Sequence, residues 1–158
     1  MIILGIDPGI ALTGWGVLNA YSRDKFTFID CGCIETHSNS SVGVRLAEIH
    51  NKLQFVITQY KPHIIAIEEL FFMKLTKNIL AIAQARGVMI LTISLQQIPL
   101  FEYNPKLIKL TLTGNGNASK KQIQDMVKDL LNLKTILKPD DIADALAIAI
   151  CHINNIEW

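Results

Sequence analysis

Residues 1–16 read MIILGIDPGIALTGWG, and this stretch decides the fold. Apolar residues surround a glycine and lead directly into Asp7, after which Pro8 and Gly9 signal a turn. A continuous apolar run bounded by a turn is typical of a strand that is buried on both faces. A lone carboxylate at the end of such a strand is costly unless it meets a cation or a proton. We therefore expect Asp7 to be the first member of an acidic metal site.

The composition suits one domain that spans residues 1–158. Half of the 158 residues are hydrophobic, which is enough for a substantial core. No apolar run is long enough to span a membrane, and the initiator methionine opens directly on the first strand without a signal peptide. The three cysteines lack zinc-site spacing, which indicates reduced thiols in a cytoplasmic protein.

The net charge of +1 conceals a basic segment between residues 71 and 124. Its only acid is Glu102, against seven basic residues: Lys74, Lys77, Arg86, Lys106, Lys109, Lys120 and Lys121. A polyanion-binding surface beside an acidic centre gives this pattern, and ordinary solvated faces are the alternative.

The predicted elements form an antiparallel meander followed by alternating helices and parallel strands. Strands are predicted at residues 2–7, 13–20, 26–36, 64–68 and 98–103, with a polar turn at 19–25. Helices are predicted from a cap at Ser40 or Ser41 to residue 61, and at 78–94, 105–112, 119–131 and 141–155. This order predicts an α/β domain with a mixed sheet. The helix at 78–94 is apolar nearly all round, so we expect it to be buried in the core or against a partner subunit.

The strand at 64–68 ends, like the first strand, in carboxylates. Glu68 and Glu69 point to opposite faces of a strand, so only one of them can join Asp7. The residues alone do not decide which one does.

The last helix begins with three further carboxylates. Asp141 and Asp144 are neighbours at i, i+3 on a largely apolar helix, where their mutual repulsion resists ionisation unless a cation offsets it. Asp140 either reaches Asp144 as well or caps the helix. Oxygen ligands without a nearby histidine or cysteine favour magnesium or manganese over zinc. The alternative to a metal site is that these carboxylates only cap helices or lie on the surface as solvated charges.

Six segments in order resemble the RuvC family of Holliday-junction resolvases along the whole chain. They are GIDPGIALTGWGVL at 5–18, AIEELFF at 66–72, AQARGVMI at 83–90, FEYNPKLIK at 101–109, GNGNASKKQIQDMV at 114–127 and DDIADALAIAICH at 140–152. The resemblance implies a ribonuclease H-like fold and a homodimer that nicks four-way DNA junctions symmetrically, in partnership with a branch-migration motor.

The resemblance also assigns site residues. It implies that the catalytic, metal-binding carboxylates are Asp7, Glu68, Asp141 and Asp144, with two Mg²⁺ per active site and Mn²⁺ as a substitute. Asp7 would bridge the ions in a two-metal hydrolysis that leaves a 5′ phosphate and a 3′ hydroxyl. It further implies DNA contacts at Phe71, by stacking, and at Lys109 and Lys120.

Lysines near the predicted helix starts suit phosphate contact, with ordinary solvated lysines as the alternative. Ser119 and Gln122 form a capping-box pattern, which sets Lys120 and Lys121 on the first turn of a helix. We expect at least one of the adjacent aromatics at 71–72 to be a core residue.

Three other functions are alternatives to junction cleavage. The pattern GIDPG…TG…G also resembles the phosphate-binding hairpin of the actin and sugar-kinase ATPases, which would make the chain a nucleotide-binding module. However, 158 residues hold one such lobe, and that reading leaves the terminal DDIAD unexplained. The others are a related nuclease acting on ribosomal RNA precursors and a non-catalytic junction-binding protein.

Overall fold

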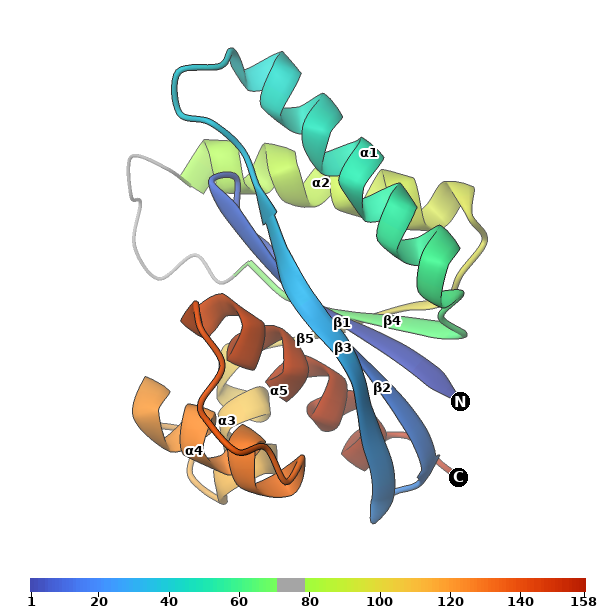
Figure 1. Cartoon of the computed structure of the whole chain (residues 1–158), viewed down its shortest axis with the longest axis vertical. Coiled ribbons are helices and arrows are strands. Elements are labelled where there is room, and N and C mark those ends of the chain that lie inside the picture. Colours follow the sequence, from blue (N-terminus) through green and yellow to red (C-terminus); the bar gives the residue numbers. More distant parts are fainter. Residues whose placement is uncertain (71–78) are drawn as a thin grey trace.

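A five-stranded mixed sheet is the middle layer of the computed structural model, which describes residues 1–70 and 79–158 (Figure 1). The strand order across the sheet is β3-β2-β1-β4-β5. The first three strands pair antiparallel, whereas β4 is parallel to β1 and β5 is parallel to β4. The prediction of an antiparallel meander followed by parallel strands is therefore confirmed. The strands are β1 Ile2–Asp7, β2 Leu12–Ser22, β3 Lys25–Glu35, β4 Ile64–Glu68 and β5 Leu100–Tyr103.

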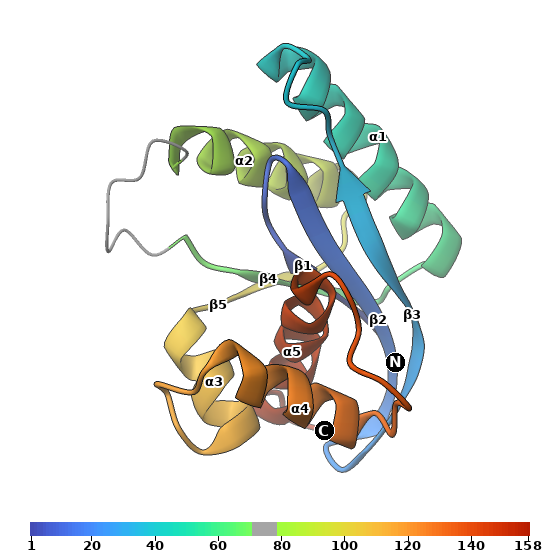
Figure 2. The same cartoon turned by 60° about the vertical axis from the view of Figure 1, so that its left-hand side comes forward.

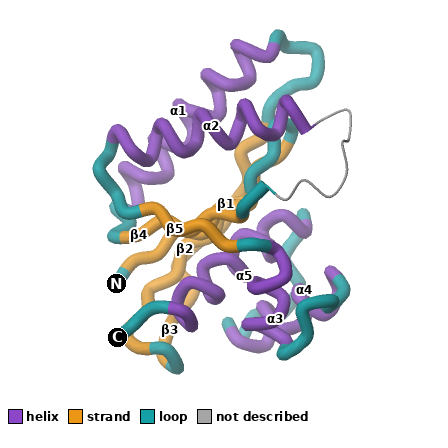
Figure 3. The backbone as a smooth tube through the Cα atoms, turned by 180° about the vertical axis from the view of Figure 1, so that it is seen from behind, coloured by secondary structure: helices purple, strands orange, loops and turns teal. Residues whose placement is uncertain are grey.

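Helices cover both faces of the sheet (Figures 2 and 3). Helices α1 (Val42–Tyr60) and α2 (Ile79–Leu95) lie together on one face. Helices α3 (Pro105–Thr113), α4 (Lys120–Leu130) and α5 (Asp140–Asn155) lie on the other. Each face has its own cluster of buried apolar side chains, so β1, at the centre, is buried on both sides as its sequence predicts.

Glycines in the first hairpin let α5 lie directly against the sheet. A Cβ added at Gly5 would stand 2.0 Å from the carbonyl oxygen of Ala145, and one at Gly14 would stand 2.0 Å from that of Asp141. Both distances are far below any real carbon–oxygen contact, so a side chain at either position would push the helix away. The start of α5 is thereby held beside the end of β1, because Gly14 pairs with Asp7.

Several boundaries differ from the predicted ones for identifiable reasons. β2 continues to Ser22 because it pairs with β3 along its whole length, so the polar turn predicted at 19–25 is shorter. Ser41 rather than Ser40 caps α1, accepting a hydrogen bond from the Val44 amide. Ile148 and Cys151, on the same side of the last helix as Asp141 and Asp144, are fully buried, because α3 and α4 cover the side of α5 that faces away from the sheet.

Helix α2 is apolar on nearly all sides, but it is buried on only one. Its buried side chains include Ala85, Met89 and Ile93, which belong to the core that it shares with α1. Leu80, Leu91 and Leu95 remain well exposed. No helix among residues 1–70 and 79–158 combines the length and apolarity needed to cross a membrane. The three cysteines are free thiols.

Candidate active site

Two parallel strands and one helix bring three carboxylates into one pocket. Asp7 ends β1 and Glu68 ends β4, and these strands pair in register through Ile6 and Ile67. The two acids therefore emerge side by side from the same edge of the sheet. Asp144 joins them from the first turns of α5, and all three line a pocket of about 300 Å³.

Two lysines complete the polar lining of this pocket. Asn104 caps α3 through the Leu107 amide, and Lys109 follows one turn later. On α4 the predicted capping box between Ser119 and Gln122 is present, which places Lys120 at the first helical position. The rest of the pocket lining is apolar and consists of Pro105, Ile108, Ile123 and Ala147.

Burial and crowding make the carboxylates hold protons more tightly than usual. Burial, followed by the charges of Glu68, Asp144 and Asp141, raises the pKa of Asp7 from 3.8 to about 8. Burial and the charge of Asp144 raise the pKa of Glu68 from 4.5 to about 7. The pKa of Asp144 is also raised, chiefly by burial. A cation placed among these groups would reverse the shifts, because it stabilises the ionised forms.

Lys120 is the only described lysine that forms an ion pair with a pocket carboxylate. Its ammonium lies 3.0 Å from Asp140 and 3.7 Å from Asp144. The hydrogen bond from Lys120 lowers the pKa of Asp140, whereas the pKa of the more buried Asp144 stays raised. Asp140 therefore lies at the rim, where it holds Lys120, and is not part of the pocket lining.

The remaining predicted residues lie near the pocket or outside the described chain. Asp141 does not line the pocket, but its charge contributes to the raised pKa of Asp7. Lys121 is exposed on the first turn of α4 and also does not line it. Phe71 falls outside the described residues, as does Phe72. Among residues 1–70 and 79–158, no three His, Cys, Asp or Glu side chains are close enough to form a metal-binding group as they stand.

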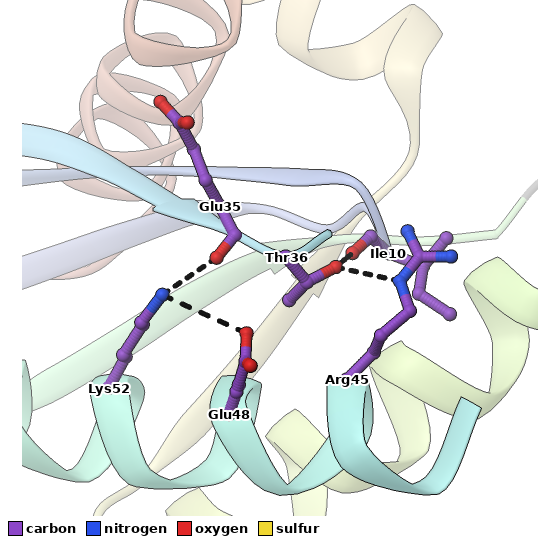
Figure 4. A network of polar contacts seen from close by, with 6 residues as sticks. All are labelled: Ile10, Glu35, Thr36, Arg45, Glu48 and Lys52. Carbon is purple, nitrogen blue, oxygen red and sulfur yellow. Dashed lines mark hydrogen bonds and ion pairs between the residues drawn. The ribbon is translucent and has the colours of Figure 1, made fainter. Parts of the chain in front are cut away.

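Hydrogen bonds that the sequence did not predict fix the turn that follows Asp7, and those of Thr36 with Ile10 and Arg45 are drawn in Figure 4. The Thr13 hydroxyl donates to the Gly9 carbonyl at 2.7 Å, and the Thr36 hydroxyl donates to the Ile10 carbonyl. Arg45 Nε in turn donates to the Thr36 hydroxyl at 2.8 Å. No local sequence signal indicates these partners, because Thr36 lies 26 residues after Ile10.

A second cluster of contacts ties α1 to the end of β3 in the same region (Figure 4). Lys52 donates to the Glu35 carbonyl at 2.7 Å and lies 4.0 Å from Glu48 on its own helix. Together the two clusters hold the loop between β3 and α1 against the β1–β2 turn. They thereby support the end of the central strand β1, where Asp7 lies.

Comparisons with known proteins match one and the same family over nearly the whole chain. The family described as crossover junction endodeoxyribonuclease RuvC matches residues 3–152. Two relatives of that name, from Endomicrobium trichonymphae and Caldicellulosiruptor saccharolyticus, are 60% and 50% identical to this chain. The first comparison covers 100% of this chain and 83% of the relative, and the second covers 97% and 92%.

A solved structure of the same family has a closely similar fold. The structure titled "T. thermophilus RuvC in complex with Holliday junction substrate" is 31% identical, with a TM-score of 0.90 over 96% of this chain and 92% of that one. The fold is thus ribonuclease H-like, as expected, and the nucleotide-binding and ribosomal RNA alternatives gain no support. The chain belongs to the RuvC family of crossover junction endodeoxyribonucleases, hydrolases that act on DNA.

Proposed function

We propose that this chain cuts four-way DNA junctions by metal-dependent hydrolysis of phosphodiester bonds in the pocket between β1, β4 and α5. One observation carries the proposal: Asp7, Glu68 and Asp144 line the same pocket as Lys109 and Lys120. This combination offers oxygen ligands for cations beside ammonium groups for a phosphate. The junction as substrate is supported by the family and by the Holliday junction bound to the Thermus thermophilus relative.

The donor set fits Mg²⁺, with Mn²⁺ as a substitute. The pocket offers carboxylate oxygens and no histidine or cysteine, which suits these cations better than zinc. Burial and the neighbouring carboxylates raise the pKa values of Asp7 and Glu68, and a cation bound among them would stabilise their ionised forms. Two Mg²⁺ ions held by Asp7, Glu68, Asp141 and Asp144 would activate the attacking water and stabilise the leaving 3′ oxygen.

The chain's own groups bind and orient the DNA strand. Lys109 and Lys120 reach the pocket from two different helices, so they can hold the phosphates on either side of the bond to be cut. Lys121, exposed beside Lys120, adds charge at the free N–H groups of the first turn of α4. Attack in line with the leaving 3′ oxygen yields a 5′ phosphate and a 3′ hydroxyl. Phe71 is proposed to stack on a base of the junction.

The exposed side of α2 is the proposed homodimer interface. Leu80, Gln84, Gly87 and Leu91 recur at spacings of three and four residues, and all are exposed. A Cβ at Gly87 would meet no heavy atom within 4 Å among the described residues, so a second helix can approach closely there. A twofold dimer carries two identical active sites, which is what paired, symmetric nicks require. We also propose a cytoplasmic location and partnership with a branch-migration motor.

Incubation with a synthetic four-way junction and Mg²⁺ tests the proposal. Duplex DNA, structured RNA and ATP serve as controls for the other functions. We expect paired nicks in strands of like polarity, which a ligase seals without further treatment. Equal cutting of duplex and junction, or hydrolysis of ATP alone, would contradict the proposal.

A further inference from the structure

Arg86 links α2 to the ends of β4 and β5, on the opposite side of the sheet from the catalytic pocket. Its Nε donates to the backbone carbonyl of Glu68 at 3.1 Å, and its Nη2 donates to the carboxylate of Glu102 on β5. Only 13% of the Arg86 side chain is exposed, so the guanidinium is largely removed from water. Glu102, the only acid between residues 71 and 124, is thus the ion-pair partner of Arg86.

The Glu68 carbonyl, which accepts from Arg86, lies at the point where the pairing of β4 with β1 has ended. Pairing of β1 with β4 ends at Ile67, so the ladder on that side stops one residue before Glu68. On the other side, the Glu69 amide donates to the Tyr103 carbonyl at 2.9 Å. Arg86 supplies a hydrogen bond to the Glu68 carbonyl at this strand end, beyond the last residue of β4 that pairs with β1.

The side chains of Glu68 and Glu69 leave the strand on opposite faces. Glu68 lines the pocket with Asp7, whereas Glu69 lines a groove with Arg86 and Glu102. A shift of the backbone at Glu68 would therefore move its carboxylate relative to Asp7 and Asp144. Arg86 opposes this shift because its planar guanidinium donates in fixed directions to two acceptors on two strands.

We propose that Arg86 is a positioning residue that fixes the backbone of Glu68 from α2 and so holds the Glu68 carboxylate in place for metal-dependent cleavage. The proposal rests on the function proposed above. Glu102 keeps the guanidinium oriented and balances its buried charge. Arg86 touches neither DNA nor the reacting atoms in this role, and acts only through Glu68.

Arg86→Met tests this role because it keeps an unbranched side chain and removes every donor. Groups that orient a metal ligand typically contribute about 10- to 100-fold to metal affinity or activity. We therefore expect a single-turnover cleavage rate about 10- to 100-fold lower and a higher half-saturating Mg²⁺ concentration. Junction affinity in EDTA should stay within about twofold of wild type, because no DNA contact is removed. Without DNA, Mg²⁺ should raise the melting temperature of the variant less than that of wild type.

Two further variants separate positioning from simple loss of stability. Arg86→Lys keeps the charge near Glu102 but cannot donate to both acceptors, so we expect the same shift in Mg²⁺ dependence in a folded protein. If Arg86→Met fails to fold, this lysine variant decides the question. Arg23→Met is the matched control, because Arg23 is exposed in the β2–β3 turn, at the end of the sheet away from Asp7. It should behave as wild type.

The outcomes distinguish this proposal from the proposed function. A wild-type protein that leaves the junction uncut refutes the proposed function itself. An active wild type with Arg86 variants of normal rate and normal Mg²⁺ dependence overturns the positioning role alone. A rate loss that follows only the folded fraction, with an unchanged Mg²⁺ midpoint, overturns it as well.

Discussion

Replacing Asp7 with asparagine should stabilise the metal-free protein at neutral pH while abolishing cleavage. Asparagine resembles the protonated carboxyl in size and charge, so it removes the cost of ionising a buried group. The pKa of Asp7 is raised from 3.8 to about 8 by burial and by Glu68, Asp144 and Asp141. The folded state therefore holds a proton that the unfolded state releases between these two values.

The sign and size of the pH effect follow from this difference. Below about pH 4 both states are protonated, and the contribution of Asp7 to stability is fully present. It is lost as the pH rises toward 8, at about 1.4 kcal/mol per pH unit. Between pH 4 and pH 7 the loss reaches about 4 kcal/mol as an upper limit. We expect Asp7→Asn to recover about 2–4 kcal/mol at pH 7, or roughly 5–15 °C in melting temperature for a chain of this size.

Urea unfolding in EDTA at several pH values from 4.5 to 8 measures this effect. The free energy of unfolding of wild type should fall below that of Asp7→Asn as the pH rises, and the two should converge near pH 4.5. Addition of Mg²⁺ at pH 7.5 should stabilise wild type more than the variant. Asp24→Asn, at an exposed turn residue, is the matched control and should follow wild type. Parallel pH curves of unfolding free energy for wild type and Asp7→Asn would refute the claim that burial disfavours ionisation of the Asp7 carboxyl.

Three further substitutions test the site and its supports. Gly14→Ala should destabilise the fold by at least about 2 kcal/mol in urea unfolding, because its Cβ would stand 2.0 Å from the Asp141 carbonyl oxygen; an unchanged midpoint would show that α5 yields easily. Lys120→Ala should weaken junction binding and reduce the slope of log affinity against log salt by about one, as measured by titration at several salt concentrations; an unchanged slope would exclude a phosphate contact. Leu91→Glu on the exposed side of α2 should convert dimers to monomers in sedimentation, whereas Phe55→Glu on α1, at a still more exposed position, should not; equal dissociation in both would argue against α2 as the interface.

The sequence alone predicts the strand-end position of Asp7 and the sheet topology. The apolar run before Asp7 and the glycines after it are local signals, and β1, β2 and their pairing follow from them. The choice between Glu68 and Glu69 came from the family resemblance, and in the structure only Glu68 lines the pocket. The catalytic roles of these carboxylates remain predictions.

What could not be predicted depends on contacts between residues far apart in the chain. The bond from Arg86 to the Glu68 carbonyl spans 18 residues, and neither position carries a local signal for the other. The burial of α5 on two sides does not follow from its own sequence, because the second side is covered by α3 and α4, which come from other parts of the chain. Asp140 was ambiguous for the same reason: its partner Lys120 comes from a different helix.

Cleavage of a synthetic four-way junction by wild type and by Asp7→Asn, both in Mg²⁺, tests the central claim most directly. Junction binding measured in EDTA shows that each protein is folded and competent. The account predicts paired nicks with ligatable ends by wild type, and no detectable nicks by a variant that binds the junction with similar affinity. Cleavage by Asp7→Asn at the wild-type rate would show that the pocket at the end of β1 is not where the phosphodiester bond is cut.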